Sequence, residues 1–93
     1  DGNLHSVCTV SDPTTGRKME ILTDQPGLQF YSGNFFDGSY CGKVEGQPIG
    51  YREALALETQ KGPDSINHPG FTDTVLRPGE VYTQHTIYKF SAE

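Results

Sequence analysis

The sequence has few basic residues and no long apolar run. Its 7 lysines and arginines are scattered among 12 acidic residues, which gives a formal net charge of −5 and a pI near 5.0. Scattered cations do not form the positive patch that attracts a phosphate backbone, so we expect no nucleic-acid partner. No apolar run approaches the roughly 20 residues of a membrane span, and no signal-peptide pattern is present, so we expect no membrane partner.

Large apolar side chains are also scarce. Leu, Ile, Val and Phe make up 20 of the 93 residues, which is close to the level below which a chain usually cannot bury enough surface to fold. We therefore expect a thin core and interpret residues 1–93 as one segment of a single larger domain. The absence of an initial Met suits a fragment or a processed chain.

Cysteine is limited to Cys8 and Cys41, too few to establish a disulfide framework. We expect two free thiols, with Cys41 the more reactive because it lies in a glycine-rich stretch that should be exposed. No Asn-x-Ser/Thr glycosylation acceptor occurs in the sequence. Both observations predict a cytoplasmic protein.

Histidine and cysteine do not recur at metal-binding spacing. His5 and Cys8 are three residues apart, which puts them on opposite faces of a strand. His68 precedes a proline in a loop, and His85 lies among threonines in an extended run. No glycine-rich phosphate loop precedes a helix either. We therefore expect neither a metal nor a cofactor.

Turn signals divide the sequence into short extended runs. "SDPTTGR" places Pro13 early in a turn and Gly16 where a positive φ is needed, while "QPGL" and "RPGE" both have the Pro-Gly order of a type II turn. β-branched and aromatic residues concentrate between these turns, and no segment has helical periodicity with caps. The sequence therefore predicts an all-β chain. The five expected strands are at about residues 4–10, 17–23, 28–32, 54–60 and 81–90.

The last of these runs alternates in polarity. Tyr82, Tyr88 and Phe90 share one face, opposite to Lys89, which is typical of an antiparallel sheet with one buried face. The longest irregular segment is residues 33–51, which is rich in glycine. A loop of that length is usually functional or mobile.

Glu58 ends the apolar run of "EALALETQ". Strand alternation places it with Ala54 and Ala56 on one face, opposite Leu55 and Leu57. The leucine face can pack in a core, while the small alanines leave open volume beside the carboxylate. Such a carboxylate is suited to act as a positioned base. The alternative is an edge-strand Glu that points into solvent, and the pattern leaves both interpretations open.

Gln29 follows the turn in "PGLQFYSGN" and shares a strand face with Tyr31. An amide beside an aromatic ring can hydrogen-bond the hydroxyls of a sugar and stack on its ring. An ordinary exposed glutamine is the alternative.

Three blocks of the sequence are specific as a set: "GRKMEILTDQPGLQFYSGNFFDG", "GYREALALETQKGPDSINHPGF" and "LRPGEVYTQHTIYKF". In this order and spacing they resemble the C-terminal part of the galactose mutarotase (aldose 1-epimerase) family, over about Asp12 to Phe90. The resemblance implies an antiparallel β-supersandwich, of which this chain is the C-terminal portion. It also implies an isomerase that interconverts the α and β anomers of free aldohexoses such as galactose or glucose.

The same resemblance implies roles for two residues. The Glu of "LETQ", here Glu58, matches the catalytic base that takes the proton from the anomeric hydroxyl, and the Gln of "PGLQFY", here Gln29, matches a residue that hydrogen-bonds the sugar. The catalytic His, a substrate-binding Asp and an Arg of the family lie upstream of this chain. We therefore expect the chain to supply the base half of a site that an upstream part, in the same or a second chain, completes.

The geometry expected of that half-site is specific. Glu58 should lie on a central strand, line a cleft and be close to Gln29. Gly62 departs from the family, which often has an aromatic residue before "PD", so one wall of the cleft mouth should differ.

Two alternatives share the fold. A non-catalytic sugar-binding or regulatory relative would lack one catalytic group. A hexose-6-phosphate epimerase would need an arginine cluster for the phosphate, and the basic residues after Thr23 form none.

Overall fold

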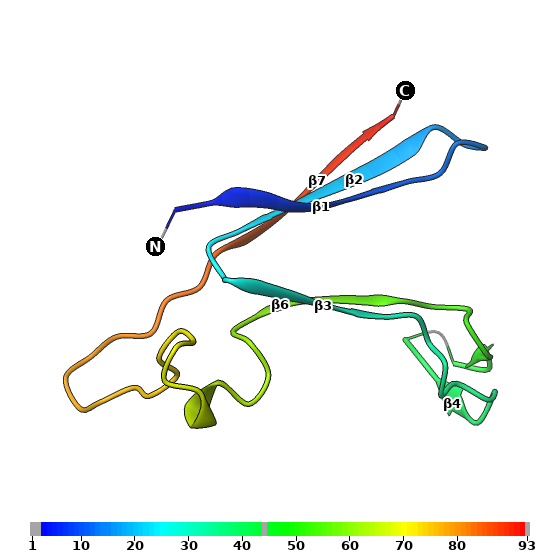
Figure 1. Ribbon diagram of the computed structural model, residues 1–93. Coiled ribbons are helices and arrows are strands. Elements are labelled where there is room, and N and C mark those ends of the chain that lie inside the picture. The colour runs from blue at the N-terminus through cyan, green and yellow to red at the C-terminus, as the bar shows by residue number, and fades with distance from the viewer. Residues whose placement is uncertain (1–2, 44, 93) are drawn as a thin grey trace. The chain divides into compact units, whose positions relative to one another are not determined.

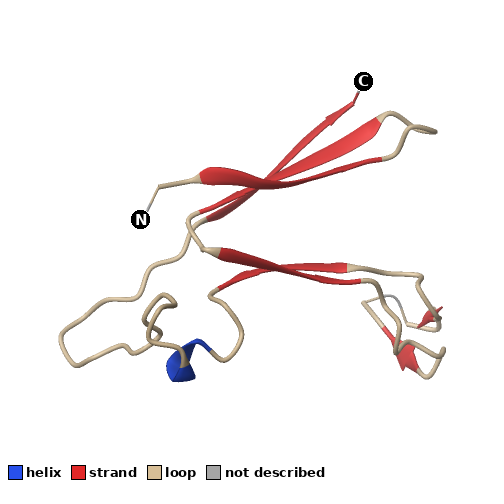
Figure 2. Ribbon diagram, in the orientation of Figure 1, coloured by secondary structure: helices blue, strands red, loops and turns tan. Residues whose placement is uncertain are grey.

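The computed structural model describes residues 3–43 and 45–92, and this part of the chain is all-β apart from one short 3₁₀ turn, η1 (Ser65–Asn67) (Figures 1 and 2). Residues up to Leu28 and from Thr59 onward form a first compact unit, and Gln29–Glu58 form a second. Within the described ranges, no helix has the length and apolar character needed to cross a membrane. The strands are β1 (His5–Ser11), β2 (Arg17–Thr23), β3 (Gly27–Tyr31), β4 (Tyr40–Cys41), β5 (Pro48–Ile49), β6 (Ala56–Gln60) and β7 (Thr86–Ala92).

The hairpin between β1 and β2 closes as the sequence predicts. The Asp12 carboxylate accepts hydrogen bonds from the Thr14 N–H (2.9 Å) and the Thr15 hydroxyl (3.1 Å), and Gly16 adopts a φ of 75°. The hydrogen bond from the Thr14 backbone is the main cause that lowers the pKa of the Asp12 carboxyl from its ordinary value. Side-chain capping and a left-handed glycine together form the turn.

The first unit contains a three-stranded antiparallel sheet in the order β1-β2-β7. Figure 1 shows β2 running between its two neighbours. The β2–β7 register is continuous, from Arg17 opposite Ala92 to Thr23 opposite Thr86. The β1–β2 register contains one irregularity just before Cys8. The expected antiparallel all-β class is therefore confirmed.

The two Pro-Gly sequences behave differently. In "RPGE", Gly79 has a φ of 87° and the Glu80 N–H donates to the Arg77 carbonyl oxygen (3.0 Å), as expected for a type II turn. In "QPGL" the prediction is wrong, because Gly27 has no positive φ and begins β3. A Cβ at Gly27 would lie 3.1 Å from the Gln60 carbonyl oxygen. The close approach of β6, rather than a turn, favours glycine there.

Residues 33–51 are more regular than predicted. They contain a small antiparallel sheet of β4 and β5, with Tyr40 opposite Ile49. The ring of Phe36 contacts the rings of Tyr31 and Tyr40, at centroid distances of 5.8 and 6.4 Å. These aromatic contacts order a segment whose glycines alone favour irregular structure.

The last predicted run becomes a strand only at Thr86, and residues 81–85 lie outside it. The His85 N–H donates to the Asp24 carboxylate (3.2 Å), and the Asp24 N–H donates to the His85 carbonyl oxygen (3.3 Å). The Asp24 carboxylate thus accepts the hydrogen bond that the His85 N–H would otherwise donate to a backbone carbonyl of a neighbouring strand. The predicted buried face is also absent from the described structure, because every residue of β7 is exposed, Phe90 to 73%.

The apolar core is very small. Ile21, at the centre of β2, is the only buried apolar side chain in the described part of the chain. Many large apolar side chains are exposed, among them Phe30, Phe35, Ile66, Val81, Ile87 and Phe90. The thin core expected from the composition is therefore observed.

Expressed alone, residues 1–93 should unfold on heating without a cooperative transition. Burial of one large apolar side chain contributes about 1.5–3 kcal/mol, whereas ordering the backbone costs roughly 1–2 kcal/mol per residue. Circular dichroism during heating measures the transition, and a dye that binds exposed apolar surface should fluoresce already at low temperature. A sharp transition without dye binding would contradict this expectation.

Candidate active site

The two residues implicated by the sequence lie on neighbouring strands of one sheet. Gln29 is the third residue of β3 and Glu58 the third residue of β6, and β3 pairs with β6. Both residues belong to the second unit, and both are exposed.

Two close approaches of the backbone define the register of this pair. A Cβ at Gly27 would lie 3.1 Å from the Gln60 carbonyl oxygen, and a Cβ at Gly33 would lie 2.6 Å from the Ala54 carbonyl oxygen. The chain advances six residues from Gly27 to Gly33 and goes back six residues from Gln60 to Ala54. This is the relation expected of two antiparallel strands. Counted along this register, Gln29 falls opposite Glu58. Directly opposite residues point to the same face, so the amide and the carboxylate share one face of the sheet.

The Glu58 carboxylate has no hydrogen-bond or ion-pair partner among the described residues. Its neighbours on the same face are Ala54 and Ala56, whose methyl groups leave space beside it. Lys61, the nearest cation in the sequence, is placed over the ring of Tyr82, with Nζ 5.0 Å from the centroid. An exposed and unpaired carboxylate next to small side chains is chemically available as a base.

The expectation that Glu58 lies on a central strand is wrong for the described part of the chain. There β6 has a single hydrogen-bonded neighbour, β3. No other described strand pairs with β6. The described residues therefore do not form the second wall of the expected cleft.

Gln29 lies beside an aromatic cluster. Its Nε2 donates to the Phe30 carbonyl oxygen (3.4 Å). Tyr31, two residues further along the same face, accepts the Phe35 N–H at its hydroxyl (3.0 Å) and stacks on the Phe35 ring at 6.4 Å. An amide and two aromatic rings therefore lie within a few residues of one another in this part of the second unit, and a sugar-binding surface there stays a prediction.

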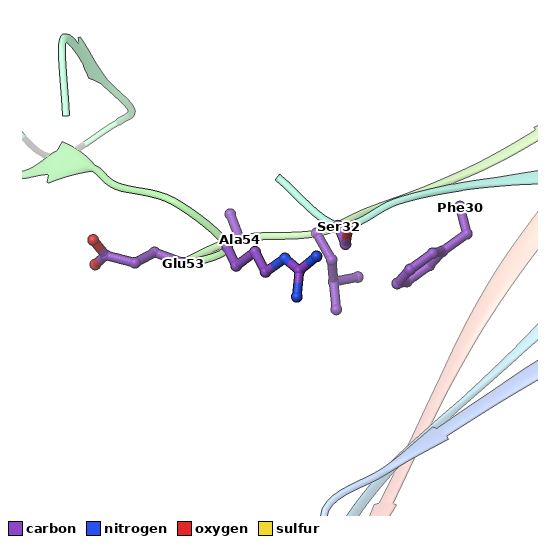
Figure 3. Close-up of a pocket in the computed structure, with 6 residues that line it drawn as sticks. Phe30, Ser32, Glu53 and Ala54 are labelled. Carbon is purple, nitrogen blue, oxygen red and sulfur yellow. The ribbon is translucent and has the colours of Figure 1, made fainter. Parts of the chain in front are cut away.

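A cavity of about 470 Å³ lies beside β3 and the approach to β6. Its lining includes Phe30, Ser32 and Leu55, which alternate with Gln29 and Glu58 along β3 and the approach to β6 (Figure 3). Glu53 also lines it, but Figure 3 shows its side chain extending away from Phe30, and its carboxylate accepts the Gly50 N–H (2.9 Å). Ala54 and Arg52 complete the lining, which does not include Gln29 or Glu58.

The arginines are engaged individually. Arg52, at a left-handed φ of 58°, donates from Nε to Asn34 (2.9 Å) and lies over the ring of Tyr51. Arg77 pairs with Asp73 at 3.1 Å. These two residues do not form the cluster that a phosphate group requires.

The histidines have local partners. His68 Nε2 lies 3.1 Å from the Asp64 carboxylate, and its ring stacks on Phe71 at 4.8 Å. His5 Nδ1 lies 3.3 Å from the Asn3 carbonyl oxygen. The described residues contain no group of three or more potential metal ligands.

Phe71 was not singled out from the sequence. A Cβ at Gly62 would lie 3.3 Å from the Phe71 ring. This ring therefore occupies the space into which a side chain at position 62 would project. A side chain at position 62 would require the Phe71 ring to shift by a few tenths of an ångström. This contact between two loop residues nine positions apart has no sequence signal.

The fold and these residues agree with the comparisons with known proteins. The profile of the aldose 1-epimerase family matches residues 1–89, and the chain belongs to this family. It is 49% identical to mouse galactose mutarotase over 82 residues, which cover 88% of this chain and 24% of that protein. It is 45% identical to human galactose mutarotase over 87 residues (94% and 25%) and to Escherichia coli K12 aldose 1-epimerase over 78 residues (82% and 22%). The chain thus spans about a quarter of the length of these relatives.

Cys8 and Cys41 are free thiols, with Cys41 exposed on β4 and Cys8 half-buried on β1. A thiol reagent should therefore react with Cys41 first, because access limits the reaction. Titration under denaturing, non-reducing conditions should count two thiols per chain, and Cys41→Ser should remove the faster phase. A count of zero, or a fast phase that survives this substitution, would contradict the assignment.

Proposed function

We propose that this chain is part of an aldose 1-epimerase that interconverts the anomers of free aldohexoses, and that it supplies the base half of the active site. The observation that carries the proposal is the pairing of β3 with β6, the strands that contain Gln29 and Glu58, and the register inferred from the close approaches at Gly27 and Gly33 supports it. The names of the similar proteins, galactose mutarotase and aldose 1-epimerase, support it.

Glu58 acts first in the proposed reaction. Its carboxylate removes the proton from the anomeric hydroxyl while an acid protonates the ring oxygen, and the bond between the anomeric carbon and the ring oxygen breaks. The aldehyde rotates, and closure from its other face returns the two protons and gives the second anomer. Gln29, on the same face, hydrogen-bonds a sugar hydroxyl and orients the anomeric carbon towards the base.

The acid and the remaining sugar-binding groups are proposed to lie outside these 93 residues, in the same or a second chain. Within the described structure, the His68 ring is held by Asp64 and Phe71, and His85 is tied by its backbone to Asp24. Residues 1–93 alone should therefore not accelerate mutarotation.

The alternatives on the same fold are less well supported. A non-catalytic sugar-binding relative would not need an unpaired carboxylate at Glu58. A hexose-6-phosphate epimerase needs paired cations for the phosphate, and Arg52 and Arg77 each have another partner. The two free thiols fit the proposed cytoplasmic location.

Glu58→Gln should retain the shape of the full-length enzyme and remove its base. Loss of a general base typically lowers the rate about 10²–10⁴-fold. Polarimetry on freshly dissolved α-galactose measures the rate. Glu53→Gln is the matched control, because that carboxylate serves the Gly50 turn, and it should keep activity within a few-fold. Near-normal activity of Glu58→Gln would reject the mechanism.

Gln29→Leu should mainly weaken sugar binding. The loss of one hydrogen bond to the substrate should raise KM for galactose about tenfold, with a smaller effect on kcat. Gln47→Leu, at an exposed glutamine in the β4–β5 segment, makes the same change as a control and should leave KM unaltered. An unchanged KM in Gln29→Leu would remove Gln29 from the site.

A further inference from the structure

Three threonine hydroxyls form a row in the first unit. Thr59 Oγ1 of β6 lies 3.0 Å from Thr86 Oγ1 of β7, which lies 3.2 Å from Thr23 Oγ1 of β2. Thr23 and Thr86 are register partners, so their side chains share one face. Thr59 belongs to the other sheet. Within the first unit, the row therefore joins Thr59 to the pair formed by β2 and β7.

The hydrogen bonds of Thr23, at one end of the row, determine which hydroxyl donates and which accepts in each pair. Thr23 Oγ1 donates its single proton to the His85 carbonyl oxygen (3.0 Å) and accepts the Gln25 N–H (3.2 Å). Because a hydroxyl has only one proton to donate, Thr86 must donate to Thr23. Thr59 must then donate to Thr86.

The outer end of the row is closed by Gln84. Its Nε2 lies 3.2 Å from both the Thr59 carbonyl oxygen and Thr59 Oγ1. Each hydroxyl therefore both donates and accepts, and hydrogen bonds aligned head to tail strengthen one another. Loss of the Thr86 hydroxyl leaves the Thr59 hydroxyl without its acceptor in the row and Thr23 without one of its donors.

Asp24 anchors the segment that carries the row. Its carboxylate accepts the His85 N–H and the Gln25 side-chain amide, both at 3.2 Å. The hydrogen bond from the His85 backbone is the main cause that lowers the pKa of the Asp24 carboxyl from its ordinary value. The carboxylate therefore stays ionised at neutral pH and holds the start of β7 beside Thr23, which is fully buried.

We propose that this threonine row positions the Glu58 carboxylate, with Thr86 as the central positioning residue. The inference rests on the proposed function. Because the Glu58 side chain has no partner in the described residues, its direction depends on the backbone of β6. Thr59 is the next residue of that strand, and the row holds it independently of the pairing with β3.

Thr86→Val tests the row, since valine keeps the shape of the side chain and removes the central hydroxyl. In the full-length enzyme it should lower kcat about five- to tenfold and change KM for galactose less than twofold, because a misdirected base slows proton transfer while the sugar-binding groups remain. Thr86→Ser restores the hydroxyl and should recover most of kcat. Thr9→Val, at an exposed position of β1, is the matched control and should alter neither constant.

Thr59→Val should lower kcat by a similar factor. The Thr59→Val, Thr86→Val double variant should be no slower than either single variant, because both changes break the same row. If the row only stabilises the fold, the variants will have a lower Tm but an unchanged kcat per folded molecule at 25 °C, and the proposal is rejected. Independent, multiplying effects of the two substitutions, or no recovery in Thr86→Ser, would also reject it.

The Glu58→Gln variant separates the two proposals. If Glu58→Gln is inactive but Thr86→Val is fully active, only the positioning role is wrong. If Glu58→Gln is fully active, there is no base to position and both proposals are wrong.

Discussion

The uninterrupted pairing of β2 with β7 is the interaction on which the rest of the first unit depends. It joins Thr23 to Thr86, which are 63 residues apart, and it makes β2 the central strand whose Ile21 is buried. It also brings Thr86 within reach of Thr59. Thr59, the residue after Glu58 in β6, is thereby held by a hydrogen bond to a distant strand.

Local chemistry was sufficient to predict some elements and not others. The bounds of β2 and the left-handed Gly16 follow from a capped turn and β-forming residues, which act over a few positions. The role of Gly27 depends on the approach of β6, and the late start of β7 depends on Asp24. Contacts between residues far apart in the sequence decide such features, and no local pattern contains them.

The sequence pattern likewise predicted only part of the candidate site. Strand alternation predicts Glu58 on the face of the small alanines, but it could not tell a base from a solvated carboxylate. The roles of Glu58 and Gln29 came from the resemblance of whole motifs to a family. The exposed side chains of β7, such as Phe90, fit a chain that spans about a quarter of its relatives, in which further strands are proposed to cover these faces.

The distance in sequence between β2 and β7 also has a consequence during translation. At about 5–20 residues per second, the ribosome needs roughly 3–13 s to synthesise the 63 residues that separate Thr23 from Thr86. During this interval the β1–β2 hairpin can form, but the other edge of β2 has no partner. An open edge with free N–H and C=O groups readily pairs with strands of other chains. Until β7 is synthesised, β2 is therefore an open edge of the nascent chain at which such pairing can begin.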